Sequence, residues 1–163
     1  MPNPGQPTIR LGDKGEHVRY AQRGLRRSES QNLVVDGIFG PQTEEQVRDF
    51  QQGMSLPVDG IVGPATWNAL PDGAPMPILR EGSTGPVVAS LQQVLTELSN
   101  GRWPTPGAAD GVFGPLTRKS VVGFQQWGDV AQDGVVGDQT WFVRIDGMMA
   151  TLESYVGLQY LQR

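Results

Sequence analysis

Apolar residues recur at helical spacing early in the chain and predict three helices there. The first helix should begin near Glu16, because Val18, Ala21 and Leu25 lie at i, i+3 and i+7 and share one face. A second helix should begin at the Gly-Pro pair that follows. Its apolar stripe consists of Thr43, Val47, Phe50 and Met54. A third, short helix should run over residues 64–70.

The same pattern returns later in the chain, so the sequence is an internal repeat. The phrase Asp-Gly-Ile-Phe-Gly-Pro-Gln-Thr at residues 36–43 recurs with two changes at 110–117. A shorter Asp-Gly phrase that ends in Thr-Trp begins at Asp59 and again at Asp133, with the same offset of 74 positions. The first helix recurs at an offset of 70, so the second copy holds four extra residues, in the stretch that contains 101–107. Such self-similarity identifies two copies of one structural unit.

The length of 163 residues fits two small units, each near the lower size at which domains fold alone. We expect the first unit at residues 1–72 and the second at 73–163, joined through the proline-rich stretch 71–77. Residues 148–163 should add a further helix. Its inner face consists of Met149, Leu152, Val156 and Tyr160. The expected fold class is all-α, with two tandem three-helix bundles and a C-terminal helical extension.

Each Asp-Gly phrase is typical of a turn that leads directly into a helix. An aspartate bonds backbone N–H groups of its own turn, and a proline at the first helical position loses no hydrogen bond. The four aspartates, Asp36, Asp59, Asp110 and Asp133, occupy nearly identical contexts and should have similar pKa values. They therefore do not form the pair with separated pKa values that a glycosidase needs.

Composition argues against several classes of function. The formal net charge of −4 and the pI near 4.9 argue against a nucleic-acid partner, which requires a basic surface. The chain has no cysteine and a single histidine, His17, so we expect no disulfide, no metal site and no cofactor. No stretch reaches the roughly 20 apolar residues of a membrane span, and the N-terminus lacks the features of a signal peptide. We expect no membrane partner.

The repeated residues resemble a known family. Each copy has Gly-x-x-Gly-x-x-Val before a helix, followed by Asp-Gly-x-Phe-Gly-Pro-x-Thr, Phe-Gln-Gln and Asp-Gly-x-x-Gly-x-x-Thr-Trp. This order is similar to that of the peptidoglycan-binding domains of the three-helix type, which are attached to bacterial and phage cell-wall hydrolases. The resemblance covers residues 9–70 and 79–145. It departs at Asp138, which stands where the other three Gly-Pro pairs have proline.

The resemblance implies a protein that is not an enzyme and that binds peptidoglycan, through the glycan strand or the stem peptide, to target or anchor a protein to the wall. It also implies a location in the cell envelope or outside the cell, and a cell-wall hydrolase as a partner. We expect a monomer. An alternative from another class stays open, namely a phage or secretion-system assembly component that uses the fold to dock a partner protein. Sedimentation with purified sacculi separates the two.

The resemblance places the ligand groove near the loops that lead into the second and third helices of each unit. Candidate ligand contacts are Asp36, Gly37, Thr43, Asp59, Gly60, Thr66, Asp110, Gly111, Thr117, Asp133, Gly134 and Thr140. Turn and helix-cap duties are a sufficient alternative explanation for most of them.

Two further candidates lie outside these loops. Trp103, in the extra stretch of the second unit, is either an exposed platform for a sugar ring or a plug between the units. Arg19, Arg23 and Arg27 lie at i, i+4 and i+8, as either a solvated face or a row that holds stem-peptide carboxylates by forked hydrogen bonds. The second unit lacks this row, so we expect the first unit to bind more tightly.

Overall fold

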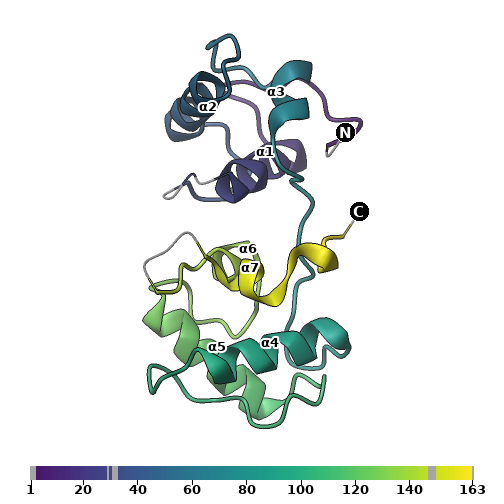
Figure 1. Cartoon of the computed structure of the whole chain (residues 1–163), viewed down its shortest axis with the longest axis vertical. Helices are drawn as coiled ribbons and strands as arrows, with labels where there is room; N and C mark the ends of the chain where they lie inside the picture. The colour runs from purple at the N-terminus through teal and green to yellow at the C-terminus, as the bar shows by residue number, and fades with distance from the viewer. Residues whose placement is uncertain (1–2, 29, 31–32, 147–149, 163) are drawn as a thin grey trace. The chain divides into compact units, whose positions relative to one another are not determined.

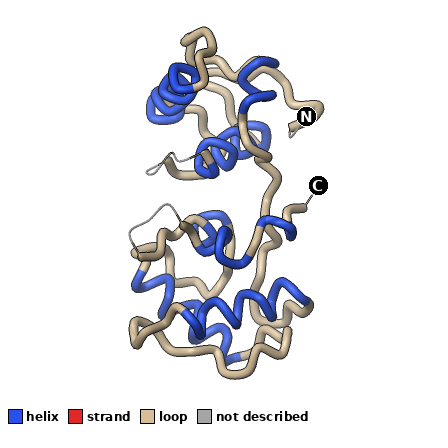
Figure 2. Tube along the Cα trace, in the orientation of Figure 1, coloured by secondary structure: helices blue, strands red, loops and turns tan. Residues whose placement is uncertain are grey.

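The computed structural model describes residues 3–28, 30, 33–146 and 150–162. The chain divides into two compact units, Met1–Pro75 and Met76–Gln162. Helices are the regular secondary structure of the described residues (Figure 2). The loops between them meet in isolated bridges, such as that of Ile9 with Val62. The predicted all-α fold class is confirmed.

Three helices form the first unit: α1 (Glu16–Arg27), α2 (Pro41–Gly53) and α3 (Pro64–Ala69) (Figure 1). The buried cluster of this unit consists of Ile9, Val18, Ala21, Leu25, Leu33, Phe39, Val47, Val62, Trp67 and Leu70. The predicted stripe of α2 is only partly buried, because Phe50 is half-buried and Met54 is 50% exposed. The C-terminal half of α2 therefore presents apolar surface outside this core.

Glycine and proline set the starts of the helices. Gly15 and Gly85, directly before α1 and the first helix of the second unit, have φ angles of 115° and 122°, a region that side chains other than glycine avoid. Pro41 and Pro64 stand at the first turns of α2 and α3, where a missing N–H costs no hydrogen bond. Because these signals are local, the helix starts could be predicted from sequence.

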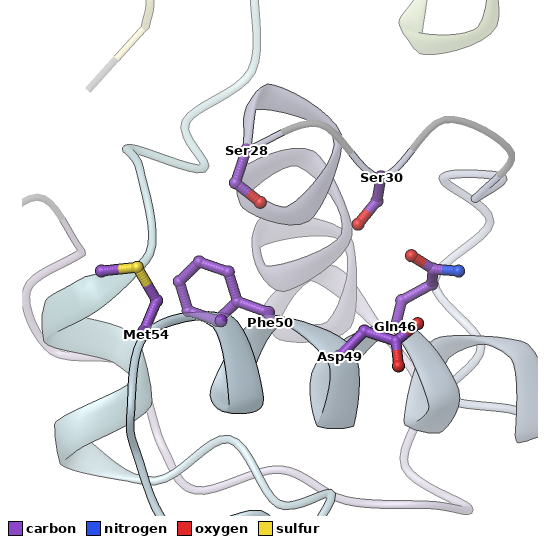
Figure 3. Close-up of a pocket in the computed structure, with 7 residues that line it drawn as sticks. Ser28, Ser30, Gln46, Asp49, Phe50 and Met54 are labelled. Atoms are coloured by element: carbon purple, nitrogen blue, oxygen red, sulfur yellow. The ribbon is translucent and has the colours of Figure 1, made fainter.

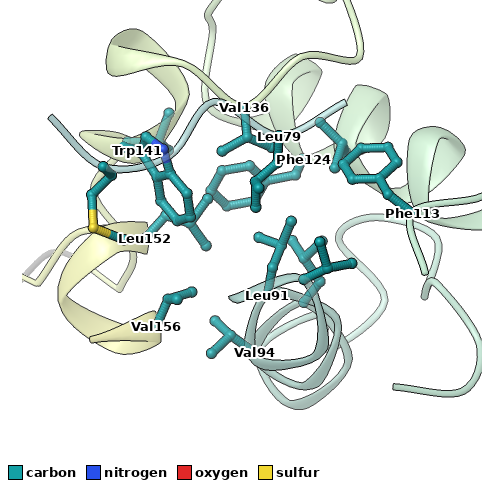
Figure 4. Packing of buried hydrophobic residues seen from close by; sticks show 14 of the residues in the cluster. Leu79, Leu91, Val94, Phe113, Phe124, Val136, Trp141, Leu152 and Val156 are labelled. Carbon is teal, nitrogen blue, oxygen red and sulfur yellow. The ribbon is translucent and has the colours of Figure 1, made fainter. Parts of the chain in front are cut away.

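The second unit repeats this arrangement and extends it. Its elements are α4 (Pro86–Glu97), α5 (Pro115–Trp127), α6 (Asp138–Trp141), α7 (Leu152–Val156) and the 3₁₀ helix η1 (Leu158–Tyr160). Side chains from α4, α5, α6 and α7 meet in one core (Figure 4). Leu152 and Val156 are 1% and 5% exposed, so the extension is part of this core.

The prediction of one continuous C-terminal helix is wrong. Gly157, with a φ of 114°, separates the five-residue α7 from η1, and Thr151 caps α7 by accepting a hydrogen bond from the Ser154 N–H. Tyr160 still reaches the unit, since its hydroxyl lies 2.9 Å from that of Ser90. Met149 lies outside the described residues.

Candidate functional site

A buried glutamine holds each Asp-Gly loop, and the loop at Asp59 shows how. Gln51, on α2, donates from Nε2 to the Asp59 carboxylate and the Ile61 carbonyl, both at 2.9 Å, and lies 3.1 Å from the Thr66 hydroxyl. Its Oε1 accepts the backbone N–H of Gly60 at 3.0 Å. One side chain therefore ties the loop to α2 and to the first turn of α3.

The same network recurs around all four loops. Its glutamines are Gln22, Gln51, Gln92 and Gln125, each 1% exposed or less. Every one of them contacts the loop aspartate and a threonine seven positions further on, at 2.9–3.2 Å. Each threonine is nearly buried, and its hydroxyl accepts from the glutamine. A buried amide with all its partners present fixes the loop geometry rigidly.

The loop aspartates close their own turns, as the sequence predicted. In each loop the carboxylate accepts the backbone N–H two residues on, at 2.9–3.0 Å. The carboxylate side chains remain exposed, whereas Thr43, Thr66, Thr117 and Thr140 are 2–5% exposed. Of the residues predicted to touch a ligand, the aspartates are accessible and the threonines are mainly structural.

The electrostatics of the loops do not create an acid–base pair. The pKa of Asp59 is lowered from its ordinary value of 3.8, first by the N–H of Ile61 and then by Gln51. The pKa of Asp110 is lowered in the same way, first by the N–H of Val112 and then by Gln92. Both aspartates are shifted in the same direction, opposite to that needed by a general acid near neutral pH. No cluster of three metal-ligating side chains occurs among the described residues.

Three of the four loops border an open concavity beside the helix that follows. The concavities measure about 190 Å³ at Asp59, 310 Å³ at Asp110 and 250 Å³ at Asp133. Each is lined by the loop aspartate, by an apolar residue two positions later and by residues of the first helical turn. Leu116, which lines the largest, is 63% exposed. The repeat thus builds the same shallow surface site in both units.

Arginine side chains lie against the glycines of three loops. A Cβ atom added to the glycine would lie 3.0 Å from Arg19 Cζ in the first loop and 3.0 Å from Arg48 Nε in the second. In the fourth loop it would lie 2.9 Å from Arg118 Nε. Arg48 and Arg118 are exposed. The second and fourth loops therefore combine an exposed carboxylate, a guanidinium group and a concavity.

The interpretation of Arg19, Arg23 and Arg27 as one accessible row is wrong. Arg23 is 3% exposed, donates to the Gly73 carbonyl at 3.0 Å and pairs with Glu16 at 2.7 Å. Arg27 donates to the carbonyls of residues 72 and 74, both at 2.7 Å. The row therefore fixes the segment after α3, and only Arg19 keeps a substantially exposed side chain, at 41%.

Trp103 is not the exposed platform that its sequence context suggested. It is 5% exposed, belongs to the core of the second unit and donates its indole N–H to the Leu95 carbonyl at 2.9 Å. Its ring packs edge-on against Phe124 at 5.0 Å. The ring is therefore a core residue of the second unit.

The sequence interpretation missed the four glutamines as a set. Their signal was present, because Gln22 and Gln92 recur in the first helices and Gln51 and Gln125 in the Phe-Gln-Gln phrases. A polar residue kept on the buried face of a helix predicts a buried hydrogen-bonding partner. The missing step was to pair each glutamine with the loop that follows it.

Comparison with known proteins agrees with this repeated architecture. A family model described as "Putative peptidoglycan binding domain" matches residues 14–70 and 84–142, more than half of the chain. No curated protein matches. No helix of the described residues is long and apolar enough to cross a membrane.

Solved structures with similar sequences include the SleB N-terminal domain, which is 36% identical over 39% of this chain and 88% of that one, with a TM-score of 0.38. A peptidoglycan-binding protein from Clostridioides difficile, solved with glutamine hydroxamate, is 40% identical over 39% of each chain, with a TM-score of 0.36. A Burkholderia AP3 phage endolysin is 32% identical over 71% of this chain and 36% of its own, with a TM-score of 0.37. This chain spans less than half of the last two structures. By its two family matches, the chain belongs to the peptidoglycan binding domain family and carries two copies of that domain.

Proposed function

We propose that the chain is a non-catalytic module that binds bacterial peptidoglycan through the concavities beside its Asp-Gly loops. The observation that carries this proposal is the recurrence of one concavity, with matching lining residues, at three loops distributed over both units. A polymer of repeating chemistry is suited to several equivalent sites on one protein, because binding at one site raises the effective concentration at the next.

The lining suits a sugar or a short peptide. At Asp110 the apolar faces of Val112, Leu116 and Pro106 surround the concavity, with the carboxylate at its edge. An apolar face packs on a sugar ring or an alanine methyl group, and a carboxylate accepts hydrogen bonds from hydroxyl, amide or amino groups. Because Gln92 already fixes the loop, little ordering entropy opposes binding.

The arginines beside the loops add selectivity for the charged part of the polymer. Arg48 and Arg118 are exposed and lie against loop glycines, where a guanidinium group can hold a stem-peptide carboxylate with two parallel hydrogen bonds. Arg19 supplies the same group to the first loop, where it lies 3.4 Å from the Asp36 carbonyl. Stem-peptide contact should therefore weaken as salt rises, whereas sugar stacking should not.

In this proposal the module anchors a protein, such as a cell-wall hydrolase, at the cell wall and acts there as a monomer. The alternative, an assembly component that docks a partner through the C-terminal extension, has less support. Leu152 and Val156 of α7 are buried in the second unit's own core, which leaves Tyr155 and Leu158, 41% and 42% exposed, as the large exposed apolar side chains of the extension's described residues.

Sedimentation with purified sacculi tests the proposal. Leu116→Asp places a charge in the concavity at Asp110 and should reduce the fraction of protein that sediments. Ile78→Asp is the matched control, because Ile78 is a similarly exposed apolar residue of the same unit, at 58%, and does not line that concavity. Equal loss of binding in both variants, or sedimentation of neither variant nor wild type, would count against the loop sites.

A further inference from the structure

The first unit has a groove that the loop sites do not use. It measures about 420 Å³ and lies between the end of α1 and the C-terminal half of α2 (Figure 3). Its lining residues are Ser28, Ser30, Gln46, Asp49, Phe50, Gly53 and Met54. The ring of Phe50 and the side chain of Met54 both line it and lie below Ser28 in the view of Figure 3. The floor is thus apolar and the rim is polar.

The corresponding place in the second unit is filled by that unit's own extra stretch. Trp103 packs edge-on against Phe124, with ring centroids 5.0 Å apart, and lies 5.2 Å from the ring of Trp127. Arg102 places its guanidinium group 5.0 Å from the Trp103 ring and 4.8 Å from the Trp127 ring. The second groove therefore holds an aromatic ring with a basic neighbour.

The two grooves correspond residue by residue. Helices α2 and α5 both have 13 residues and start at equivalent prolines, so Phe50 matches Phe124. Phe124 is fully buried beneath Trp103, whereas Phe50 is only half-buried. Met54, which matches Gly128, is 50% exposed. The first unit has the floor of the groove but lacks the tryptophan that covers it.

We propose that the first groove receives an aromatic side chain, with an adjacent lysine or arginine, from a segment of a partner protein. The aromatic ring takes the place over Phe50 that Trp103 takes over Phe124. Met54 adds a sulfur atom, which packs favourably against aromatic rings. The exposed carboxylate of Asp49 lies on the rim, and no described residue bonds to it, so it is available to a basic group.

Two differences between the grooves restrict the sequence of the segment that the first groove can bind. In the second unit, Gly123 allows Pro104 to pack closely on α5, because a Cβ atom at Gly123 would lie 2.5 Å from Pro104 Cδ. The matching residue of α2 in the first unit is Asp49, which has a side chain at this position. The segment bound by the first unit therefore lacks a proline directly after its aromatic residue. In the second unit the Leu95 carbonyl accepts the indole N–H of Trp103. The matching carbonyl in the first unit, that of Leu25, already accepts a hydrogen bond from the hydroxyl of Ser28 at 2.8 Å. The groove consequently needs no ring N–H and takes phenylalanine or tyrosine as well as tryptophan.

The experiment measures the fluorescence anisotropy of a fluorescein-labelled peptide, Gly-Arg-Trp-Ser-Gly, titrated with the full chain. Binding should fall about tenfold or more when the peptide's tryptophan becomes alanine, because the buried ring is the main apolar contact. Asp49→Lys should weaken binding by roughly two- to fivefold, the size of one exposed ion pair. Glu45→Lys is the matched control, since it makes the same charge change at an exposed position of α2 outside the groove and should have less effect.

Amide signals in NMR spectra locate the peptide and separate this proposal from wall binding. Shifts at Phe50 and Gly53, together with unchanged sacculus sedimentation of Asp49→Lys, support a peptide groove. Several results would overturn it: equal binding of the tryptophan and alanine peptides, equal effects of Asp49→Lys and Glu45→Lys, or shifts confined to the second unit. Shifts at Phe50 with N-acetylglucosamine oligomers but not with the peptide would assign the groove to the wall glycan instead.

Discussion

Replacing Gln125 by leucine should unfold or severely destabilise the second unit, although the two side chains have similar size. Gln125 is fully buried and contacts Asp133, Val135 and Thr140 through its amide nitrogen, at 2.9–3.0 Å. Its oxygen accepts the buried N–H of Gly134 at 3.0 Å. Leucine has neither the amide N–H donor nor the carbonyl acceptor of glutamine, so all of these hydrogen bonds are lost.

The magnitude follows from the groups left without a partner. A buried donor or acceptor that loses its hydrogen bond costs about 1–3 kcal/mol, and here a backbone N–H and a backbone carbonyl are affected. The expected loss is about 2–6 kcal/mol, less a small gain from burying leucine, against a total stability of about 5–10 kcal/mol for a small domain. Gln126→Leu, at the neighbouring exposed position, should change the stability by less than about 0.5 kcal/mol.

Urea unfolding, followed by tryptophan fluorescence and by circular dichroism, measures both variants. The two units need not unfold together, so each probe should be fitted for two transitions. A second variant, Gln125→Glu, keeps the acceptor but places a carboxylate near Asp133. It should be most destabilising above the pKa of the new group. A Gln125→Leu protein within 1 kcal/mol of wild type would show that the glutamine network does not hold the loop.

Other predictions use different parts of the molecule. Trp103→Ala should cost about 3–5 kcal/mol in urea unfolding, because it empties a buried site, whereas an exposed platform would cost almost nothing. Leu152→Ala should cost about 2–5 kcal/mol, and an unchanged melting temperature would show that α7 is not part of the core. The pKa values of Asp59 and Asp110 are lowered in the folded state, so their ionised carboxylates stabilise the fold above about pH 4. This contribution to the free energy of unfolding is lost as the pH falls through the folded pKa values. Thermal melts should show the decline, and changing both residues to asparagine should flatten it. Blocking one concavity in each unit, with Ala65→Arg at Asp59 and Leu116→Asp at Asp110, should reduce binding to sacculi by more than the product of the single effects on the fraction bound, as avidity requires.

The sequence predicted the elements whose causes are local. Helix starts at Glu16, Pro41 and Pro64 follow from glycine, proline and apolar spacing within a few residues. The Asp-Gly turns were also predicted, because each aspartate bonds an N–H only two residues away. The repeat then extended each prediction to the second unit.

The rest depends on contacts between distant residues, which spacing along one helix cannot show. Arg23 looked like part of a solvated row, but the carbonyl of Gly73, fifty positions away, draws it into the core. Trp103 looked exposed between Arg102 and Pro104, but Gly123 leaves room on α5 for Trp103 and Pro104. In both cases a contact between a helix and a segment with no helical pattern decides what the side chain touches.

The glutamine network explains how one framework can carry loops whose exposed side chains differ. In every copy the buried partners, glutamine and threonine, are the same, whereas the exposed positions of the loop and first helical turn differ. The residue after the helix-starting position is Gln42, Ala65, Leu116 or Gln139 in the four copies. Because the stability of the loop comes from backbone groups and the glutamine, these exposed residues can change without loss of the fold. The variable positions should therefore set how strongly each site binds, whereas the constant aspartate presents the same carboxylate at every loop.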